Sequence, residues 1–314
     1  MTMEAYTAHE TIRFVKEMAD AKRPFFCWAS FYRPHQPYTP VKPYLEMFDA
    51  SRWGSGTRNG DGIAKPPSLE QPPAELPSLF QTWHQGKNRI WRLDEAVRDH
   101  QHFRNYLAAY YALVAEIDHH IGRILQTLEQ TGQLENTIII YTADHGDFVG
   151  THGMVEKCAA GHNVYEDTLR VPLIIAWPGV GRARQVCDDL VELVDLFPTV
   201  LDAAGIVCRE QAGYPLPGQS LLPCLTGQGR VDRRFAISEN RLQTTVISAS
   251  YKLAVSHDPQ KIPPMLFDCV TDPYELANRY HDPEYLPVRE ALLHDLQQWQ
   301  ARTPGCGGAC SAER

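Results

Sequence analysis

The feature that most constrains the fold of this chain is a short apolar run that ends in a charged turn. Residues 137–142 read TIIIYT, and a β-branched apolar run bounded by a polar turn that contains glycine predicts a buried strand. Asp144, His145, Gly146 and Asp147 follow almost at once. Ligands of open α/β sheets bind just beyond the carboxyl ends of the strands, so a binding site is expected here.

Two side chains of this turn have the chemistry of a cation site. Asp144 offers a carboxylate oxygen and His145 an imidazole, and together these groups can bind a divalent cation. The loop that follows adds His152 and Lys157, which can meet a negatively charged substrate. A strand-to-loop turn with polar caps is the alternative interpretation. The sequence favours a functional site because His152 and Lys157 follow so closely.

The composition excludes several classes of protein. The 314 residues are 22% charged and 43% hydrophobic, as in an ordinary globular protein. The formal net charge is −8 without any basic run, so we expect no nucleic-acid partner. No apolar segment approaches the ~20 residues of a bilayer span, and no basic-then-apolar leader opens the sequence, so neither a membrane span nor a signal peptide is expected. The eight cysteines lack zinc-site spacing, which predicts free thiols.

The first two thirds of the chain read as alternating helices and strands. Apolar side chains between residues 103 and 128 recur at alternating steps of four and three, which predicts one face of a long helix packed on a sheet. Residues 24–30, PFFCWAS, read as a buried strand and, by their similarity to 137–142, as its parallel neighbour. Residues 53–91 are rich in glycine and proline without a sustained period, which predicts a long irregular surface loop.

The pattern changes after Gly205. Short strand candidates at 235–239, 244–255 and 265–268 precede a closing helix at 286–299. We therefore expect an α/β domain over residues 1–208 and a smaller α+β subdomain over 209–314, which ends in a disordered glycine-rich tail.

Several ordered motifs resemble the sulfatases of the alkaline-phosphatase superfamily. They cover the chain from about residue 8 to 279, and their shared order makes the resemblance specific. The motifs are PFFCWASFYRPHQPY, YYALVAEIDHHIG, TADHGDFVGTHGMVEK, YEDTLRVPLIIAWPG, LVELVDLFPTVLDAAG and YKL…LFDCVTDPYELAN. The PHxP and DHG…HG…K patterns look most like the iduronate-sulfatase and choline-sulfatase type. The resemblance implies an alkaline-phosphatase-like, mostly parallel sheet flanked by helices, with a smaller C-terminal α+β subdomain.

The resemblance also implies roles for individual residues. Asp144 and His145 match the pair that binds the active-site cation, with Ca²⁺ expected first and Mn²⁺ or Mg²⁺ also compatible. Lys157 matches the lysine that contacts a sulfate oxygen. His35 matches the histidine that assists departure of the alcohol, a proton transfer suited to imidazole.

Two further histidines, His152 and His162, are expected to line the substrate pocket, although either could instead satisfy backbone groups.

One motif of the family is absent from the sequence. The family's nucleophile is a formylglycine made from the cysteine of a C-x-P-S-R-type motif. Cys27 lacks the arginine of that motif, and the C-x-A-x-R formed by residues 310–314 ends a glycine-rich tail with no strand before it. No convincing precursor cysteine is therefore present, and we expect this chain to be an inactive, N-terminally truncated fragment as written.

The resemblance implies a metal-dependent sulfuric ester hydrolase that acts on a small-molecule or carbohydrate sulfate ester. Two alternatives stay open. Phosphoryl and sulfuryl groups are both tetrahedral oxyanions, so a phosphodiesterase or phosphonate monoester hydrolase on the same scaffold fits the same residues. A non-catalytic remnant that only binds a cation or an anionic ligand is the other alternative.

Overall fold

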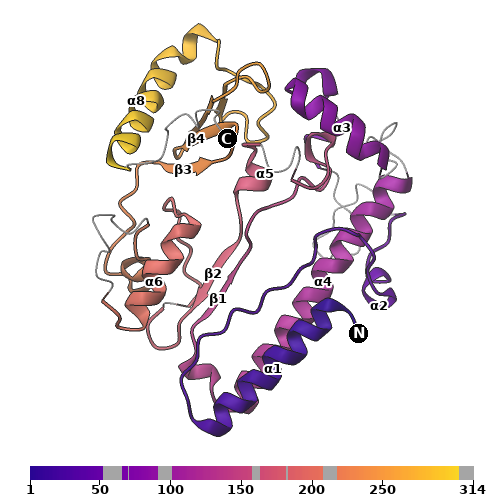
Figure 1. The fold of residues 1–314 in the computed structure, drawn as a ribbon, viewed down its shortest axis with the longest axis vertical. Helices are drawn as coiled ribbons and strands as arrows, with labels where there is room; N and C mark the ends of the chain where they lie inside the picture. The colour runs from indigo at the N-terminus through magenta and orange to yellow at the C-terminus, as the bar shows by residue number, and fades with distance from the viewer. Residues whose placement is uncertain are drawn as a thin grey trace, which may run out of the picture.

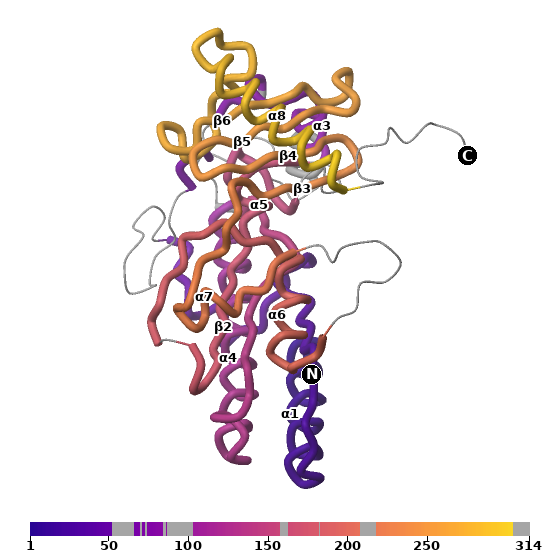
Figure 2. Tube along the Cα trace, turned by 90° about the vertical axis from the view of Figure 1, so that its left-hand side faces the viewer, coloured from indigo at the N-terminus to yellow at the C-terminus, as the bar shows by residue number. Residues whose placement is uncertain are grey.

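The computed structural model describes residues 1–51, 66–69, 71–90, 101–157, 163–181, 183–207 and 218–303. Two helices, α1 (Met3–Ala21) and α4 (Gln101–Gln130), lie side by side along one edge of the molecule (Figures 1 and 2). A two-stranded ribbon of β1 (Ile139–Thr142) and β2 (Leu173–Ala176) runs through the middle. A four-stranded sheet with helix α8 (Leu286–Arg302) occupies the other end.

The long helix expected from the apolar period is confirmed by α4. Its aromatic residues Phe103 and Tyr106 and its Leu107 form a buried cluster, against which Tyr38 packs at 4.8 Å between the Tyr38 and Tyr106 ring centroids. The helix ends just before Gly132, whose φ of 70° lies in the left-handed region that glycine tolerates best. The cluster therefore joins α4 to the turn that follows residues 24–30.

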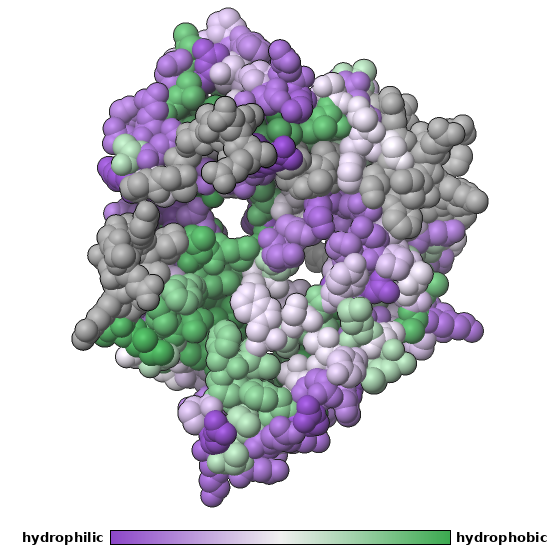
Figure 3. Space-filling model, viewed as in Figure 1, coloured by the Kyte–Doolittle hydropathy of each residue, from purple (hydrophilic) through white to green (hydrophobic). Residues whose placement is uncertain are grey.

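The strand at 137–142 is confirmed, but its predicted parallel pairing with residues 24–30 is wrong. β1 pairs antiparallel with β2, and Thr142 lies opposite Leu173. Residues 24–30 form no strand, and the side chains of Phe26 and Trp28 are 70% and 79% exposed. An apolar composition predicts that a segment favours burial, whereas a strand also needs a second backbone in hydrogen-bonding register. Figure 3 shows apolar residues gathered over β2 and helix α6 (Leu196–Ala203).

A second correction concerns the long irregular loop expected at residues 53–91. Helix α3 (Ser78–Ile90) lies within it, whereas residues 52–65, 70 and 91 are outside the described part of the chain. Pro77 precedes the helix, where its missing N–H costs nothing, and Phe80 is fully buried against Tyr165. A short apolar face around Phe80 was enough to form a helix in a sequence rich in proline.

The smaller elements connect these parts. They are α2 (Lys42–Leu45), η1 (Pro73–Glu75), η2 (Leu134–Asn136), η3 (Thr151–Gly153), α5 (Glu166–Leu169), η5 (Leu193–Asp195), α7 (Leu222–Thr226) and η6 (Pro283–Tyr285). No helix in the described part of the chain combines the length and the apolar character that crossing a bilayer requires.

The strands expected after residue 209 are confirmed as an antiparallel sheet in the order β3 (Ala236–Glu239), β4 (Gln243–Ile247), β5 (Tyr251–Ser256) and β6 (Met265–Asp268). One face packs on α8, and the other packs on the loop after β1 and on α3. The predicted boundary near residue 209 falls in 208–217, outside the described residues, and stays a prediction.

A buried ammonium group joins this sheet to the loop after β1. Lys252 of β5 is fully buried, with Nζ 3.0 Å from Glu166 Oε2 and 2.5 Å from Glu275 Oε1. Burial disfavours the charge, but Glu275 and Glu166 outweigh it and raise the pKa of Lys252. The carboxylates of Glu166 in α5 and of Glu275 after β6 therefore both pair with the ammonium group of Lys252.

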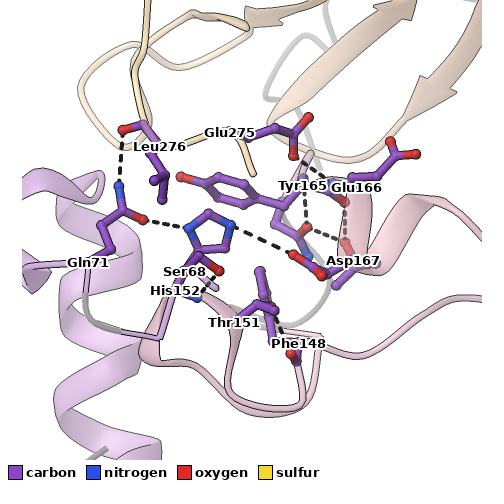
Figure 4. Close-up of polar contacts among 12 residues, drawn as sticks. Ser68, Gln71, Phe148, Thr151, His152, Tyr165, Glu166, Asp167, Glu275 and Leu276 are labelled. Atoms are coloured by element: carbon purple, nitrogen blue, oxygen red, sulfur yellow. Dashed lines mark hydrogen bonds and ion pairs between the residues drawn. The ribbon is translucent and has the colours of Figure 1, made fainter. Parts of the chain in front are cut away.

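The loop after β1 is fixed by His152, which is 1% exposed (Figure 4). Its Nδ1 lies 2.5 Å from Gln71 Oε1, which can only accept, so Nδ1 carries the proton. Its backbone N–H donates to Ser68 Oγ at 3.0 Å, and its ring packs 4.3 Å from that of Tyr165. Burial lowers the pKa of His152 to about 4. This histidine is a neutral core residue.

We expect Glu275→Gln to destabilise the fold strongly. The variant would leave the buried ammonium of Lys252 only the carboxylate of Glu166, whose side chain is 41% exposed, and breaking a buried ion pair costs about 3–5 kcal/mol in the free energy of unfolding. The matched control is Arg170→Ala, which removes an ion pair to the same Glu166 from a side chain that is 81% exposed, for a change of about 1 kcal/mol or less. Urea denaturation measures both, and equal losses in the two variants would contradict the assigned role of Lys252.

We expect the stability to fall with acid because of His152. Its pKa in the folded state, about 4, lies below the ~6.5 of an unfolded histidine, so the unfolded chain takes up a proton first. The contribution of neutral His152 to the free energy of unfolding is fully present above pH ~6.5 and is lost as the pH falls toward 4. Between these values the free energy of unfolding falls by about 1.4 kcal/mol per pH unit.

Urea denaturation of His152→Gln between pH 7 and pH 4.5 should show a weaker acid dependence than the parent protein. His9→Gln, which removes an exposed histidine of α1, is the control and should leave the slope unchanged. An unaltered slope in His152→Gln would show that other groups cause the acid loss.

Candidate active site

The Asp-His pair lies just past the carboxyl end of β1, as predicted. The His145 N–H donates to Asp144 Oδ1 at 3.0 Å, and His145 Nδ1 lies 2.7 Å from the carbonyl oxygen of Gly146. A carbonyl oxygen only accepts, so Nδ1 carries the proton of the neutral ring. The other nitrogen, Nε2, is then a lone-pair donor 3.6 Å from Asp144 Oδ2.

This donor set fits a divalent cation. The side chain of Asp144 is 86% exposed and that of His145 is 37% exposed, so both are accessible from solvent. An imidazole whose Nδ1–H is fixed by a backbone carbonyl presents Nε2 in the tautomer and orientation that metal-binding histidines use. A carboxylate oxygen adds a hard ligand. Asp144 and His145 are therefore chemically suited to hold a divalent cation.

Gly146 sets the shape of this turn. Its N–H donates to the carbonyl oxygen of Thr168 in α5 at 2.9 Å, and a Cβ at this position would collide with the carbonyl of Asp167. Only glycine permits such a close approach of two backbones. The turn that presents Asp144 and His145 is thus positioned by α5.

The prediction from sequence assigned no role to Asp147, the most perturbed carboxylate of the loop. Burial raises its pKa to about 6, and the nearby Glu156 adds to that effect, against the hydrogen bond from Val149 N–H at 3.0 Å. The same carboxylate raises the pKa of Tyr38 in addition to the effect of burial. Perturbed groups gather at functional sites, and the Asp-His-Gly-Asp run was the signal that could have identified it.

His35 lies in a turn that packs close to this loop. Its Nδ1 lies 3.0 Å from the carbonyl oxygen of Gln36, and its ring lies 4.7 Å from that of Tyr32. The turn continues to Tyr38, which interacts electrostatically with Asp147. Tyr38 and Val149 of this loop also pack against the same buried cluster, so Tyr38 is the residue that links the turn to the loop. With Nδ1–H directed to Gln36, Nε2 is the nitrogen that could take up a proton and pass it on.

The remaining predicted residues divide into three cases. Lys157 is partly exposed, and its carbonyl oxygen accepts a hydrogen bond from Asn163 Nδ2 at 2.6 Å. His162 lies outside the described residues. The prediction for His152 is corrected: its Nδ1–H is bonded to Gln71 and its Nε2 lies 3.7 Å from Asp167 Oδ2, so the ring belongs to the core below the loop (Figure 4). A common pocket for Asp144, His145 and Lys157 stays a prediction.

Comparisons with known proteins agree with this architecture. The sulfatase family model matches residues 3–206, and the model of the C-terminal region of N-sulphoglucosamine sulphohydrolase matches residues 150–302. An arylsulfatase of Clostridium perfringens is 28% identical over 93% of this chain and 57% of its own length. The multifunctional alkaline phosphatase superfamily protein PehA of Trinickia caryophylli is 30% identical over 88% of this chain and 54% of its own length.

A solved structure supports the fold. The phosphonate monoester hydrolase of Silicibacter pomeroyi superposes with a TM-score of 0.76 and 26% identity, over 95% of this chain and 60% of that protein. The chain spans about half the length of the curated relatives it matches. Its fold is of the alkaline-phosphatase-like α/β class, and the chain belongs to the sulfatase family.

Proposed function

We propose that this chain supplies the cation-binding and anion-binding residues of a metal-dependent sulfatase, an enzyme that hydrolyses sulfate esters. The observation that carries the proposal is the Asp144–His145 pair, in which the solvent-accessible carboxylate of Asp144 lies 3.6 Å from His145 Nε2 while the carbonyl oxygen of Gly146 holds Nδ1. The likeness to an arylsulfatase supports the same reaction class. We propose small-molecule or carbohydrate sulfate esters as substrates.

In this proposal each residue has one chemical task. Asp144 and His145 would hold a divalent cation, with Ca²⁺ favoured, which would supply positive charge beside the sulfate oxygens. Lys157 provides a compact positive charge that suits a tetrahedral oxyanion. His35, through Nε2, donates a proton to the departing alkoxide. We propose that His162 contacts the substrate. We also propose that Asp147, when its carboxyl group is neutral, lowers the polarity of the loop.

The nucleophile is not assigned to this chain. The family uses a formylglycine, and the sequence has no cysteine in a C-x-P-S-R-type motif. Residues that act as one catalytic unit lose nearly all activity when one member is missing. We therefore propose that the chain as written binds the cation and the anion without turnover.

A phosphonate monoester hydrolase is the second candidate. The observation in its favour is the superposition on the Silicibacter pomeroyi enzyme. A phosphonate monoester and a sulfate monoester each present a tetrahedral anionic group, and the residues named above serve either one. A non-catalytic protein that binds only a cation or an anion remains the third candidate.

We expect Asp144→Ala to weaken the binding of Ca²⁺ and Mn²⁺ by about tenfold or more, because the variant loses the hard oxygen ligand. Isothermal titration calorimetry measures both affinities. Asp118→Asn is the matched control, since Asp118 is an exposed carboxylate of α4, and its affinities should equal those of the parent. Unchanged binding in Asp144→Ala would remove the cation site from this turn.

We expect no measurable hydrolysis of an aryl sulfate or an aryl phosphonate by the chain as written, with Ca²⁺ or Mn²⁺ present. Lys157→Ala is assayed beside it, and Lys42→Ala, whose side chain is 84% exposed, is the matched control.

Turnover that disappears in Lys157→Ala but persists in Lys42→Ala would overturn the expectation of inactivity and support a complete active site. The preferred substrate would then separate the sulfatase from the phosphonate hydrolase. Cation binding without turnover in any protein that contains this chain would favour the non-catalytic candidate.

A further inference from the structure

Two thiols meet at a place remote in sequence from the proposed active site. Cys187 lies on the segment that follows β2, and Cys224 lies in α7. Their Sγ atoms and a carboxylate oxygen of Asp189 all lie within 4.8 Å of one another. Cys187 is exposed, whereas Cys224 is 7% exposed and packs beside Leu221 and Val231. One sulfur is thus accessible to reagents and the other is directly beneath it.

The side chains of Gln185 and Asp189, on either side of Cys187, bond to α7 and to the segment after it. Gln185 Nε2 donates to the carbonyl oxygen of Cys224 at 3.2 Å, and the Cys224 thiol donates to Asp189 Oδ2 at 3.6 Å. Asp189 Oδ2 also accepts from the N–H of Val231 at 3.0 Å. Because the residues two before and two after Cys187 both bond to this region, the two sulfurs stay neighbours while the exposed Cys187 side chain can rotate.

The third group of the cluster is already satisfied, which argues against a metal site. Asp189 Oδ1 accepts two hydrogen bonds from Arg230, from Nε at 2.9 Å and from a terminal nitrogen at 2.5 Å. A dication at this place would compete with the guanidinium for the carboxylate and be repelled by its charge. The thiols are the groups left to react.

We propose that Cys187 and Cys224 form a disulfide bond when the protein meets a small-molecule disulfide such as oxidised glutathione. Cys187, as its thiolate, attacks one glutathione sulfur, forms a mixed disulfide and releases one glutathione thiolate. Cys224, as its thiolate, then attacks the Cys187 sulfur and releases the second glutathione. The two protons leave with the two glutathione thiols, so the protein is oxidised by two electrons and the glutathione disulfide is reduced.

The order of the two steps follows from the surroundings of each sulfur. Burial, together with the neighbouring Cys187, raises the pKa of Cys224 to about 11, so few molecules carry a Cys224 thiolate at neutral pH. Cys187 is exposed to the glutathione and therefore reacts first. Forming the bond brings the sulfurs to about 2.05 Å, a short movement for an exposed side chain.

The test is equilibration of the purified protein in glutathione buffers of graded redox ratio, followed by acid quenching, alkylation and peptide mass spectrometry. We expect a crosslinked peptide pair that contains residues 187 and 224 and lacks two hydrogens. It should be absent in Cys187→Ser and present in Cys27→Ser, the matched control for an exposed cysteine elsewhere. The oxidised parent should melt on the order of 5 °C above the reduced one, and Cys187→Ser should show no such shift.

Two results would overturn the proposal. In one, Cys187 is recovered only as its glutathione adduct while Cys224 remains an alkylatable thiol after unfolding. In the other, zinc that survives dialysis blocks alkylation of both thiols, which would make the cluster a metal site. Circular dichroism of Cys187→Ser verifies the fold, and none of these readouts depends on sulfatase activity.

Discussion

The ion-pair cluster around Lys252 is the interaction on which the arrangement of the proposed site depends. Lys252 of β5 binds Glu166 at the start of α5, and Glu275 accepts from the backbone N–H of that same residue at 2.7 Å. Two residues further, the carbonyl oxygen of Thr168 accepts from Gly146. The C-terminal sheet thus fixes α5, and α5 fixes the turn with Asp144 and His145. Loss of either carboxylate is expected to weaken this support of the turn.

The opposite side of the site is positioned by β2. Its Leu173 and Ile175 pack on the cluster of Leu221, Cys224 and Val231, and its backbone pairs with β1. The strand that leads into the Asp-His turn is therefore supported by α7 and its neighbours, the region in which the two thiols meet. Apolar packing and buried hydrogen bonds lie beneath the exposed side chains of Asp144 and His145. This support holds the two side chains in a defined position.

Local patterns predicted the elements well and the pairings poorly. The period of α4, the β-branched run of β1 and the strands after residue 209 are properties of neighbouring residues, so the sequence contained them. Antiparallel pairing of β1 with β2 depends on a partner more than thirty residues away, which no local pattern encodes. The burial of His152 by Gln71 and Tyr165 is equally non-local. A family motif could predict the position of the Asp-His pair because the motif is a short contiguous run.

Segment 24–30 shows that an apolar sequence pattern does not by itself determine whether a segment forms a strand or is buried. Phe26 and Trp28 were expected in a core, yet both face solvent, as do Ile174 of β2 and Phe197 of α6. Each Å² of apolar surface left exposed loses about 25 cal/mol of stabilisation by burial. Within the described residues, β1 also has a neighbouring strand on one edge only. Exposed apolar side chains and an unpaired strand edge both favour association. Asp144 lies on a polar turn, so self-association through the apolar side chains and cation binding at the turn are separable properties, and aggregation alone would not refute the cation site.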